Sequence, residues 1–168
     1  MTTLSELASA GTRNPWAMAV VGTALCAVSG SVATDTRSRW YKSIDKPAWQ
    51  PPGVVFPFVW TALYSGLAAT TGRVLTELDE SDRQQEATGF RRAFVANLVL
   101  NQGWSWTFFR SHRLGLATAN AALLAASSID LARRAERASE GKGAELAPYA
   151  AWCSFATLLT ASIARRNS

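Results

Sequence analysis

Five long runs without a charged residue constrain this chain more than any other feature. They cover residues 14–34, 47–72, 93–109, 114–129 and 146–164. A helix needs about 20 mostly apolar residues, within a range of about 17–25, to cross the hydrocarbon core of a membrane. These runs meet or approach that length, whereas a soluble bundle would place a charged face on each helix. The sequence therefore predicts an all-α integral membrane protein, a bundle of five transmembrane helices.

The charged residues mark where these helices end. We expect one membrane domain over residues 15–165, with helices at about 15–34, 56–74, 92–109, 114–133 and 146–165. Residues 1–14 are predicted to be a polar N-terminal tail, and residues 75–91, which are rich in acidic side chains, are predicted to be a solvated loop.

The first uncharged run could instead be a secretory signal peptide, because Ser31-Val32-Ala33 resembles a cleavage site. The run is longer than a usual signal core, and little positive charge precedes it, so we favour a membrane span.

Several classes of function are disfavoured by what the sequence contains. The net charge is +5, but the basic residues are scattered among short connections, which argues against a nucleic-acid partner. The motifs of hydrolases, zinc proteases and nucleotide-binding loops are missing, and His112 is the single histidine, so we expect no metal site. Cys26 and Cys153 fall inside predicted spans and are interpreted as small packing residues.

A stretch rich in proline and tryptophan connects the first two predicted helices. Its prolines remove backbone donors and disfavour the helical region for the residues before them, so the part before Phe56 is predicted not to be helical. Pro57 suits the first turn of the next helix, where an N–H is not needed. We predict that residues 35–55 form a rigid lid over the bundle. The predicted lid residues are Trp40, Lys46, Pro47, Trp49, Pro51 and Pro52.

Polar and aromatic residues recur at helical spacing within the predicted spans. An amide facing lipid without a partner costs several kcal/mol, so these faces should point into the bundle. Two interpretations remain open: the asparagines are hydrogen-bonding contacts between helices, or the faces line a pocket for a flat, apolar ligand with a few polar groups. The candidate ligand-binding residues are Trp60, Tyr64, Asn97, Asn101, Trp104, Phe108, Asn120, Tyr149 and Trp152.

Three motifs in these segments resemble a known family. They are Trp40-Tyr41, Lys46-Pro47, Trp49, Pro51-Pro52, Phe56-Pro57, Trp60 and Leu63-Tyr64; then Asn101, Trp104 and Phe108-Phe109; and then Pro148-Tyr149, Trp152 and Phe155. Together they resemble the TspO/MBR family of tryptophan-rich sensory proteins and translocator proteins, over about residues 15–164. The resemblance implies five transmembrane helices, often a homodimer, and a pocket beneath the first loop. It also implies binding of porphyrins such as protoporphyrin IX, without any required cofactor.

Carried over by position, the resemblance places Trp60, Trp104, Trp152 and Asn101 in that pocket. It also makes Trp60 and Trp152 the candidates for a part in light-dependent porphyrin breakdown. The sequence departs from the family at several points. Asn97 stands where many members have glutamine, Asn120 replaces an acid of animal members, and Thr160 replaces an asparagine. Residues 159–166 contain no tyrosine, so the C-terminal sterol motif is absent and sterol binding is not expected.

Our leading hypothesis is a multipass membrane receptor that binds a tetrapyrrole in porphyrin handling or stress signalling. Lys42 and Lys46 of the lid are then candidates to pair with the propionates of the ligand. One alternative is a porphyrin-degrading enzyme in which the porphyrin is the substrate. Another is a small-molecule transporter, although transporters usually show internal repeats and broken helices, which this sequence lacks.

Overall fold

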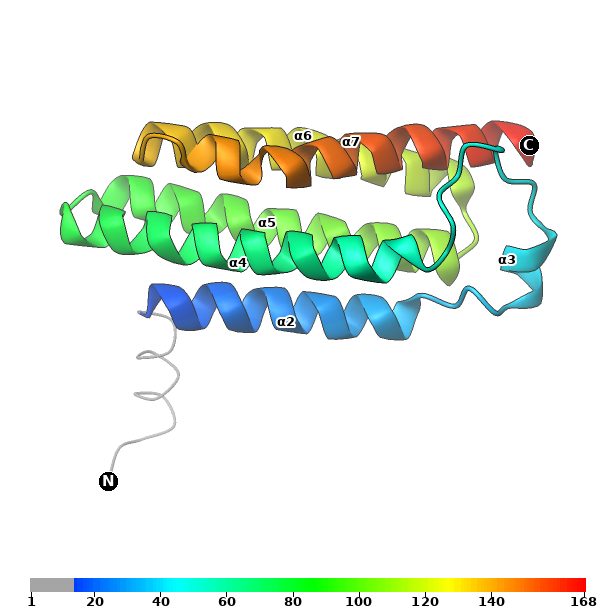
Figure 1. The fold of residues 1–168 in the computed structure, drawn as a ribbon, viewed down its shortest axis with the longest axis horizontal. Coiled ribbons are helices and arrows are strands. Elements are labelled where there is room, and N and C mark those ends of the chain that lie inside the picture. The colour runs from blue at the N-terminus through cyan, green and yellow to red at the C-terminus, as the bar shows by residue number, and fades with distance from the viewer. Residues whose placement is uncertain (1–13) are drawn as a thin grey trace, which may run out of the picture.

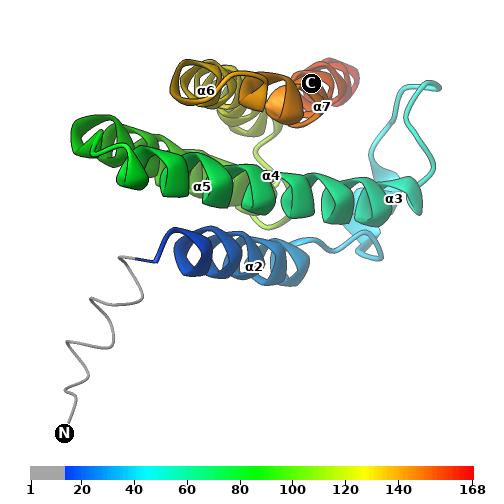
Figure 2. The ribbon, with the colours of Figure 1, turned by 60° about the vertical axis from the view of Figure 1, so that its left-hand side comes forward.

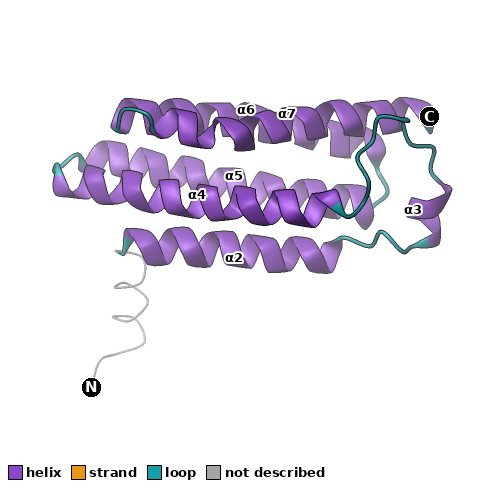
Figure 3. Cartoon of the chain, in the orientation of Figure 1, coloured by secondary structure: helices purple, strands orange, loops and turns teal. Residues whose placement is uncertain are grey.

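The structure is a computed structural model that describes residues 14–168 (Figure 1). The predicted polar tail thus falls, except for Asn14, outside the described residues. Within them the chain forms helices joined by turns and loops, without strands (Figure 3). The helices are α2 (Pro15–Ala33), α3 (Arg39–Ser43), α4 (Val55–Glu80), α5 (Gln84–Phe109), α6 (Leu114–Ala138) and α7 (Lys142–Arg166).

The five long helices run along one axis in three layers. Helices α6 and α7 form the first layer, α4 and α5 the second, and α2 the third (Figures 1 and 2). Around the bundle α2 packs against α4 and α5, α5 against α6, α6 against α7, and α7 against α4. Helices α5 and α7 meet through long side chains and have little close backbone packing. This leaves room between them at one end of the bundle.

Local sequence determines where the helices begin. Helix α2 starts because the Asn14 side chain accepts hydrogen bonds from the backbone N–H groups of Trp16 and Ala17, and Pro15 occupies the first helical position. Pro57 lies in the first turn of α4, as its missing N–H predicts. The short helix α3 starts at a Ser38 cap.

Two expected non-helical segments are helical in the structure. The predicted loop at residues 75–91 belongs mostly to α4 and α5, which leave a short turn between Glu80 and Gln84. The charged residues there are exposed or half-buried, while Leu78 and Phe90 are buried between the helices. The lid contains α3, because its prolines begin only at Pro47 and leave the preceding residues free to form one helical turn.

The surface of the bundle is typical of a protein in contact with lipid. Helices α2, α6 and α7 are each long and apolar enough to cross a membrane. Helices α4 and α5 do not reach that hydropathy, because each is charged at the end next to their connecting turn and carries aromatic and polar residues along its apolar part. One side of α2 exposes large aliphatic side chains to the surroundings. These are Val20, Val21, Leu25, Val28 and Val32.

The packing differs between the two ends of the bundle. Away from the lid, a continuous core includes Leu75, Phe90, Phe94 and Leu131, all buried. A second, smaller cluster lies under the lid, where Ile44 meets residues of α5, α6 and α7. The cavity described next begins under the lid and extends between α2 and α4 as far as Trp16 and Ala69.

Candidate functional site

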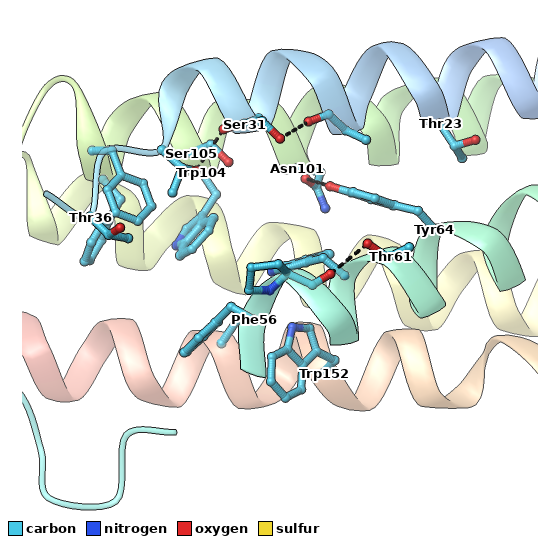
Figure 4. Close-up of a pocket in the computed structure, with 18 of the residues that line it drawn as sticks. Thr23, Ser31, Thr36, Phe56, Thr61, Tyr64, Asn101, Trp104, Ser105 and Trp152 are labelled. Atoms are coloured by element: carbon cyan, nitrogen blue, oxygen red, sulfur yellow. Dashed lines mark hydrogen bonds between the residues drawn. The ribbon is translucent and has the colours of Figure 1, made fainter. Parts of the chain in front are cut away.

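A cavity of about 830 Å³ opens between α2, α4, α5 and α7 beneath the lid (Figure 4). No Lys, Arg, Asp or Glu is among the described residues that line it. Aromatic side chains and small residues make up most of its wall. Six of the nine predicted ligand-binding residues line this cavity: Trp60, Tyr64, Asn101, Trp104, Phe108 and Trp152.

Three tryptophans from three different helices form the aromatic part of the wall. Trp60 comes from α4, Trp104 from α5 and Trp152 from α7, so the bundle brings together residues far apart in the sequence. Figure 4 shows Trp104 and Trp152 on their two helices. The indole N–H of Trp104 donates to the hydroxyl of Thr160 at 3.1 Å. Within residues 14–168, the indole N–H groups of Trp60 and Trp152 have no protein acceptor. The cavity therefore offers two unused donors on flat, apolar surfaces.

Asn101 holds one wall of the cavity in place. Its side-chain carbonyl accepts a hydrogen bond from the Tyr64 hydroxyl at 2.7 Å. Its amide nitrogen donates to the hydroxyl of Tyr149 at 3.3 Å. Both ends of the amide are thus engaged by the protein, and Tyr64 is fixed with its ring 5.2 Å from that of Trp60. Asn101 acts mainly by positioning the aromatic wall.

Three predicted pocket residues do not line the cavity. Asn97 is fully buried, donates to Ser128 at 3.0 Å and accepts from the Tyr149 hydroxyl at 2.7 Å. The Tyr149 hydroxyl lies between Asn97 and Asn101 and is hydrogen-bonded to both. Asn120 instead donates to the backbone carbonyl of Leu100 at 2.7 Å, joining α6 to α5. Both asparagines form hydrogen bonds between helices, as the first of the two interpretations expects.

The lid covers the cavity through residues other than the six predicted lid residues. Tyr41, Gln50 and Gly53 contribute to the lining, whereas the six predicted lid residues do not. Trp40 stacks on His112 with ring centroids 4.1 Å apart, and Trp49 meets Phe155 edge-on at 5.8 Å. These tryptophans attach the lid to the bundle. The signal for Tyr41 was available, since it adjoins Trp40 in a short aromatic pair.

The lid lysines that we expect to pair with ligand carboxylates do not line the cavity itself. Lys46 donates to the carbonyl of Ile44 at 3.0 Å, with its ammonium 4.6 Å from the centre of the Tyr41 ring. Lys42 is exposed on α3 and does not line the cavity. Burial raises the pKa of the Tyr41 hydroxyl, which the Gln50 amide contacts at 3.4 Å, so Tyr41 is neutral at physiological pH.

Neither metal binding nor thiol chemistry is indicated by the described residues. No group of three or more His, Cys, Asp or Glu side chains in residues 14–168 lies close enough to hold a metal ion. Cys26 and Cys153 are buried, free thiols. Cys26 contacts the Gln102 amide at 2.7 Å, in the packing between α2 and α5.

Comparison with known proteins agrees with this architecture. The model of the TspO/MBR family matches residues 17–166. The translocator protein of Bos taurus is 30% identical over 149 residues, covering 86% of this chain and 87% of the relative. The tryptophan-rich protein TspO of Chlorobaculum tepidum is 30% identical over 140 residues, covering 83% and 87%. The tryptophan-rich sensory protein of Cereibacter sphaeroides is 32% identical over 106 residues, covering 62% of each. This chain is therefore an integral membrane protein that belongs to the TspO/MBR family.

Proposed function

We propose that this protein binds a tetrapyrrole of the protoporphyrin IX type in the cavity beneath its lid. The observation that carries the proposal is the uncharged cavity of about 830 Å³ walled by Trp60, Trp104 and Trp152. Ligand sites in proteins typically enclose about 300–1,000 Å³ and are mostly apolar with a few polar groups. A large, flat macrocycle matches both the volume and the aromatic walls.

The chemistry of the wall favours stacking and burial as the source of affinity. The indoles present broad faces, and the free N–H groups of Trp60 and Trp152 are available to acceptor atoms of the ligand. Because no charged side chain lines the cavity, ionised propionates are best accommodated at its mouth, in contact with water and headgroups. The macrocycle would then lie inward and its carboxylates outward.

A titration of protoporphyrin IX in the dark tests this proposal. The shift of the porphyrin Soret band measures the Kd for purified protein in detergent. We expect Trp60→Ala and Trp152→Ala each to raise the Kd about ten-fold, equivalent to about 1.4 kcal/mol. The control is Trp106→Ala, since Trp106 is 46% exposed on the outside of α5 and does not line the cavity. Equal Kd values for all four proteins would remove this site.

The aromatic neighbours of Trp60 favour a second candidate function, light-dependent porphyrin breakdown. Its ring lies 5.2 Å from Tyr64 and 6.4 Å from Tyr149, so three oxidisable side chains are close together beside the proposed ligand. Illuminating the same samples separates this function from binding alone. Bleaching faster than that of free porphyrin, and slowed in Trp60→Ala and Trp152→Ala, would support an enzyme. Bleaching at the rate of free porphyrin would mean that the protein binds porphyrin without degrading it.

We base the proposed cellular role on tetrapyrrole binding. A receptor that takes up porphyrin from the membrane would serve porphyrin handling or stress signalling.

A homodimer, which the family resemblance implies, remains part of this proposal. Sedimentation of the detergent-solubilised protein with and without porphyrin would measure its oligomeric state.

A further inference from the structure

The two ends of the bundle differ in their balance of charge. We define the lid end as residues 35–54, 110–113 and 165–168, and the opposite end as residues 73–92 and 130–145; Figure 1 shows these segments at the two ends of the long axis. The opposite end has nine acidic and eight basic residues. The lid end also has eight basic residues, but only Asp35 and Asp45 are acidic. A strong positive charge is therefore concentrated at the lid end.

The pairing of the charges differs as well. Of the six ion pairs among the described residues, five join side chains of the opposite end. The single pair at the lid end joins Arg166 to Asp45 at 3.2 Å. Arg110 donates to the carbonyl of Val32, and Lys46 to that of Ile44. Five further cations are exposed, and their side chains have no hydrogen-bond or ion-pair partner in the part of the chain that the structure describes. They are Arg37, Arg39, Lys42, Arg113 and Arg165.

The orientation of α3 directs two of these cations away from the protein. Trp40 and Tyr41 contact Phe108 on the bundle side, at 5.6 and 6.4 Å between ring centroids. Arg39 and Lys42 are on the exposed side of the same helical turn. Aromatic residues facing inward and cations facing outward are typical of a segment at the level of lipid headgroups.

These cations are not available to a ligand inside the cavity, because none of them lines it. No described side chain pairs with them, and at the surface of a membrane the abundant anions are phospholipid headgroups. We propose that the lid end is a binding surface for anionic phospholipid headgroups, formed by Arg37, Arg39, Lys42, Arg113 and Arg165. This inference does not rest on the proposed function.

Quenching of tryptophan fluorescence by brominated lipids tests the proposal. The full-length protein is placed in vesicles of phosphatidylcholine with a varied fraction of brominated phosphatidylglycerol or brominated phosphatidylcholine. The ratio of the two relative binding constants measures the preference for the anionic headgroup. We expect the wild type to prefer phosphatidylglycerol about threefold or more at low salt, and the preference to weaken in 0.5 M NaCl.

Matched double variants locate the surface. Arg39→Gln/Lys42→Gln should lower the preference by about half, as should Arg113→Gln/Arg165→Gln, which leaves the lid unchanged. The control is Arg92→Gln/Arg133→Gln, which removes the same charge from two exposed positions of the opposite end. We expect the control to behave like the wild type. Circular dichroism of each variant checks its helix content.

Several results would overturn the proposal. They are a wild type without headgroup preference, a control variant that loses as much preference as the lid-end variants, or lid-end variants that lose none. Inorganic phosphate at matched ionic strength serves as a further probe. If it abolished the preference where chloride did not, the surface would be a site for free phosphate instead. No tetrapyrrole is present, so the outcome is independent of the proposed function.

Discussion

The side chain of Asn167 closes over the backbone of Asp45. Its carbonyl accepts a hydrogen bond from the Asp45 N–H at 2.8 Å, and its amide donates to the Asp45 carbonyl at 2.8 Å. The same amide also donates to the carbonyl of Ile163 one turn back on α7. The end of α7 thus holds the lid directly, through two residues 122 positions apart in the sequence.

Removing this contact should loosen the lid without unfolding the helices. We predict that Asn167→Ala speeds hydrogen–deuterium exchange of the Asp45 amide at least about two- to ten-fold, since the bond that this N–H donates contributes about 0.5–1.5 kcal/mol and is lost together with the bond to the Asp45 carbonyl. Far-ultraviolet circular dichroism should stay unchanged, because the substitution lies just beyond the last residue of α7.

The matched control for that experiment is Ser168→Ala. Ser168 donates only to the carbonyl of Arg165, within the same chain end, and does not touch the lid. If its exchange at Asp45 matched that of Asn167→Ala, or if neither variant differed from the wild type, the contact would not restrain the lid.

A second prediction separates packing from binding on α5. Asn97→Leu deprives the Tyr149 hydroxyl of its acceptor and two serines of a donor. We expect the free energy of unfolding in detergent to fall by about 1–2 kcal/mol, measured by titration with sodium dodecyl sulfate. Porphyrin affinity should stay unchanged, because Asn97 lies outside the cavity wall.

A double variant checks the physical reason for this loss. Asn97→Leu/Tyr149→Phe removes both partners of the strongest bond, so the two effects should be less than additive. Strict additivity would mean that the hydrogen bond does not account for the loss. A porphyrin Kd that rose in Asn97→Leu at unchanged stability would instead return Asn97 to the site.

The runs without charge predicted the helices more accurately than they predicted the helix ends. The uncharged runs located all five long helices because lipid excludes unpaired charge over a fixed thickness. They could not locate the ends of α4 and α5, because these helices continue beyond the uncharged runs into charged sequence. There Arg91 pairs with Asp79 at 2.6 Å, and Leu78 and Phe90 pack between the helices. That packing depends on contacts between helices, which a hydropathy pattern does not report.

The sequence predicted which residues share a face of one helix, but not which of them line the cavity. Asn97 and Asn101 share one face of α5, yet only Asn101 reaches the cavity, because that face passes from the open end of the bundle into its packed interior. Helical spacing in the sequence shows which side of a helix a residue is on. It does not show what part of a neighbouring helix that residue meets. The sequence likewise did not reveal that Tyr41 and Gln50 are the lid residues over the cavity.

A third prediction concerns the contact between α2 and α4. A Cβ added at Gly72 would lie 2.7 Å from two ring atoms of Trp16. Gly72→Ala should therefore force the helices apart and lower the free energy of unfolding by about 1–3 kcal/mol. Gly66, on the same helix, has open space around it. Gly66→Ala should leave stability unchanged or raise it by up to about 1 kcal/mol. If Gly72→Ala were as stable as the wild type or more stable, like Gly66→Ala, helix propensity and not the Trp16 contact would dominate.

The ion pair between Arg83 and Glu86 predicts that the stability of the fold depends on pH in the acidic range. Arg83 also donates to the carbonyl of Ala138 at 2.8 Å, so it ties the α4–α5 turn to the end of α6. The hydrogen bond from Arg83 lowers the pKa of the Glu86 carboxyl below its ordinary value near 4.5. The stabilisation is therefore present above about pH 4.5 and is lost as the pH falls through the lowered value.

Thermal unfolding between about pH 5 and pH 3 measures this loss. We expect the wild-type Tm to decline over this range and Glu86→Gln to show a flatter decline. Glu140→Gln is the control, because Glu140 is exposed and forms no ion pair among the described residues. If Glu140→Gln flattened the profile equally, general charge would explain the effect better than the pair.

The last prediction tests whether the cavity volume itself holds the ligand. Ala156 lines the cavity on α7, one turn from Trp152, while Ala151 is exposed on the outside of the same helix. Ala156→Phe would place a ring where the macrocycle is proposed to lie, and we expect the porphyrin Kd to rise at least about ten-fold, because the displaced contacts are stacking and apolar burial. The added ring enters empty space, so the Tm should change little. Ala151→Phe adds the same ring on the lipid-facing side and should bind porphyrin like the wild type. If both variants bound equally well, the porphyrin would have to sit outside the cavity, and the three tryptophans would be packing residues only.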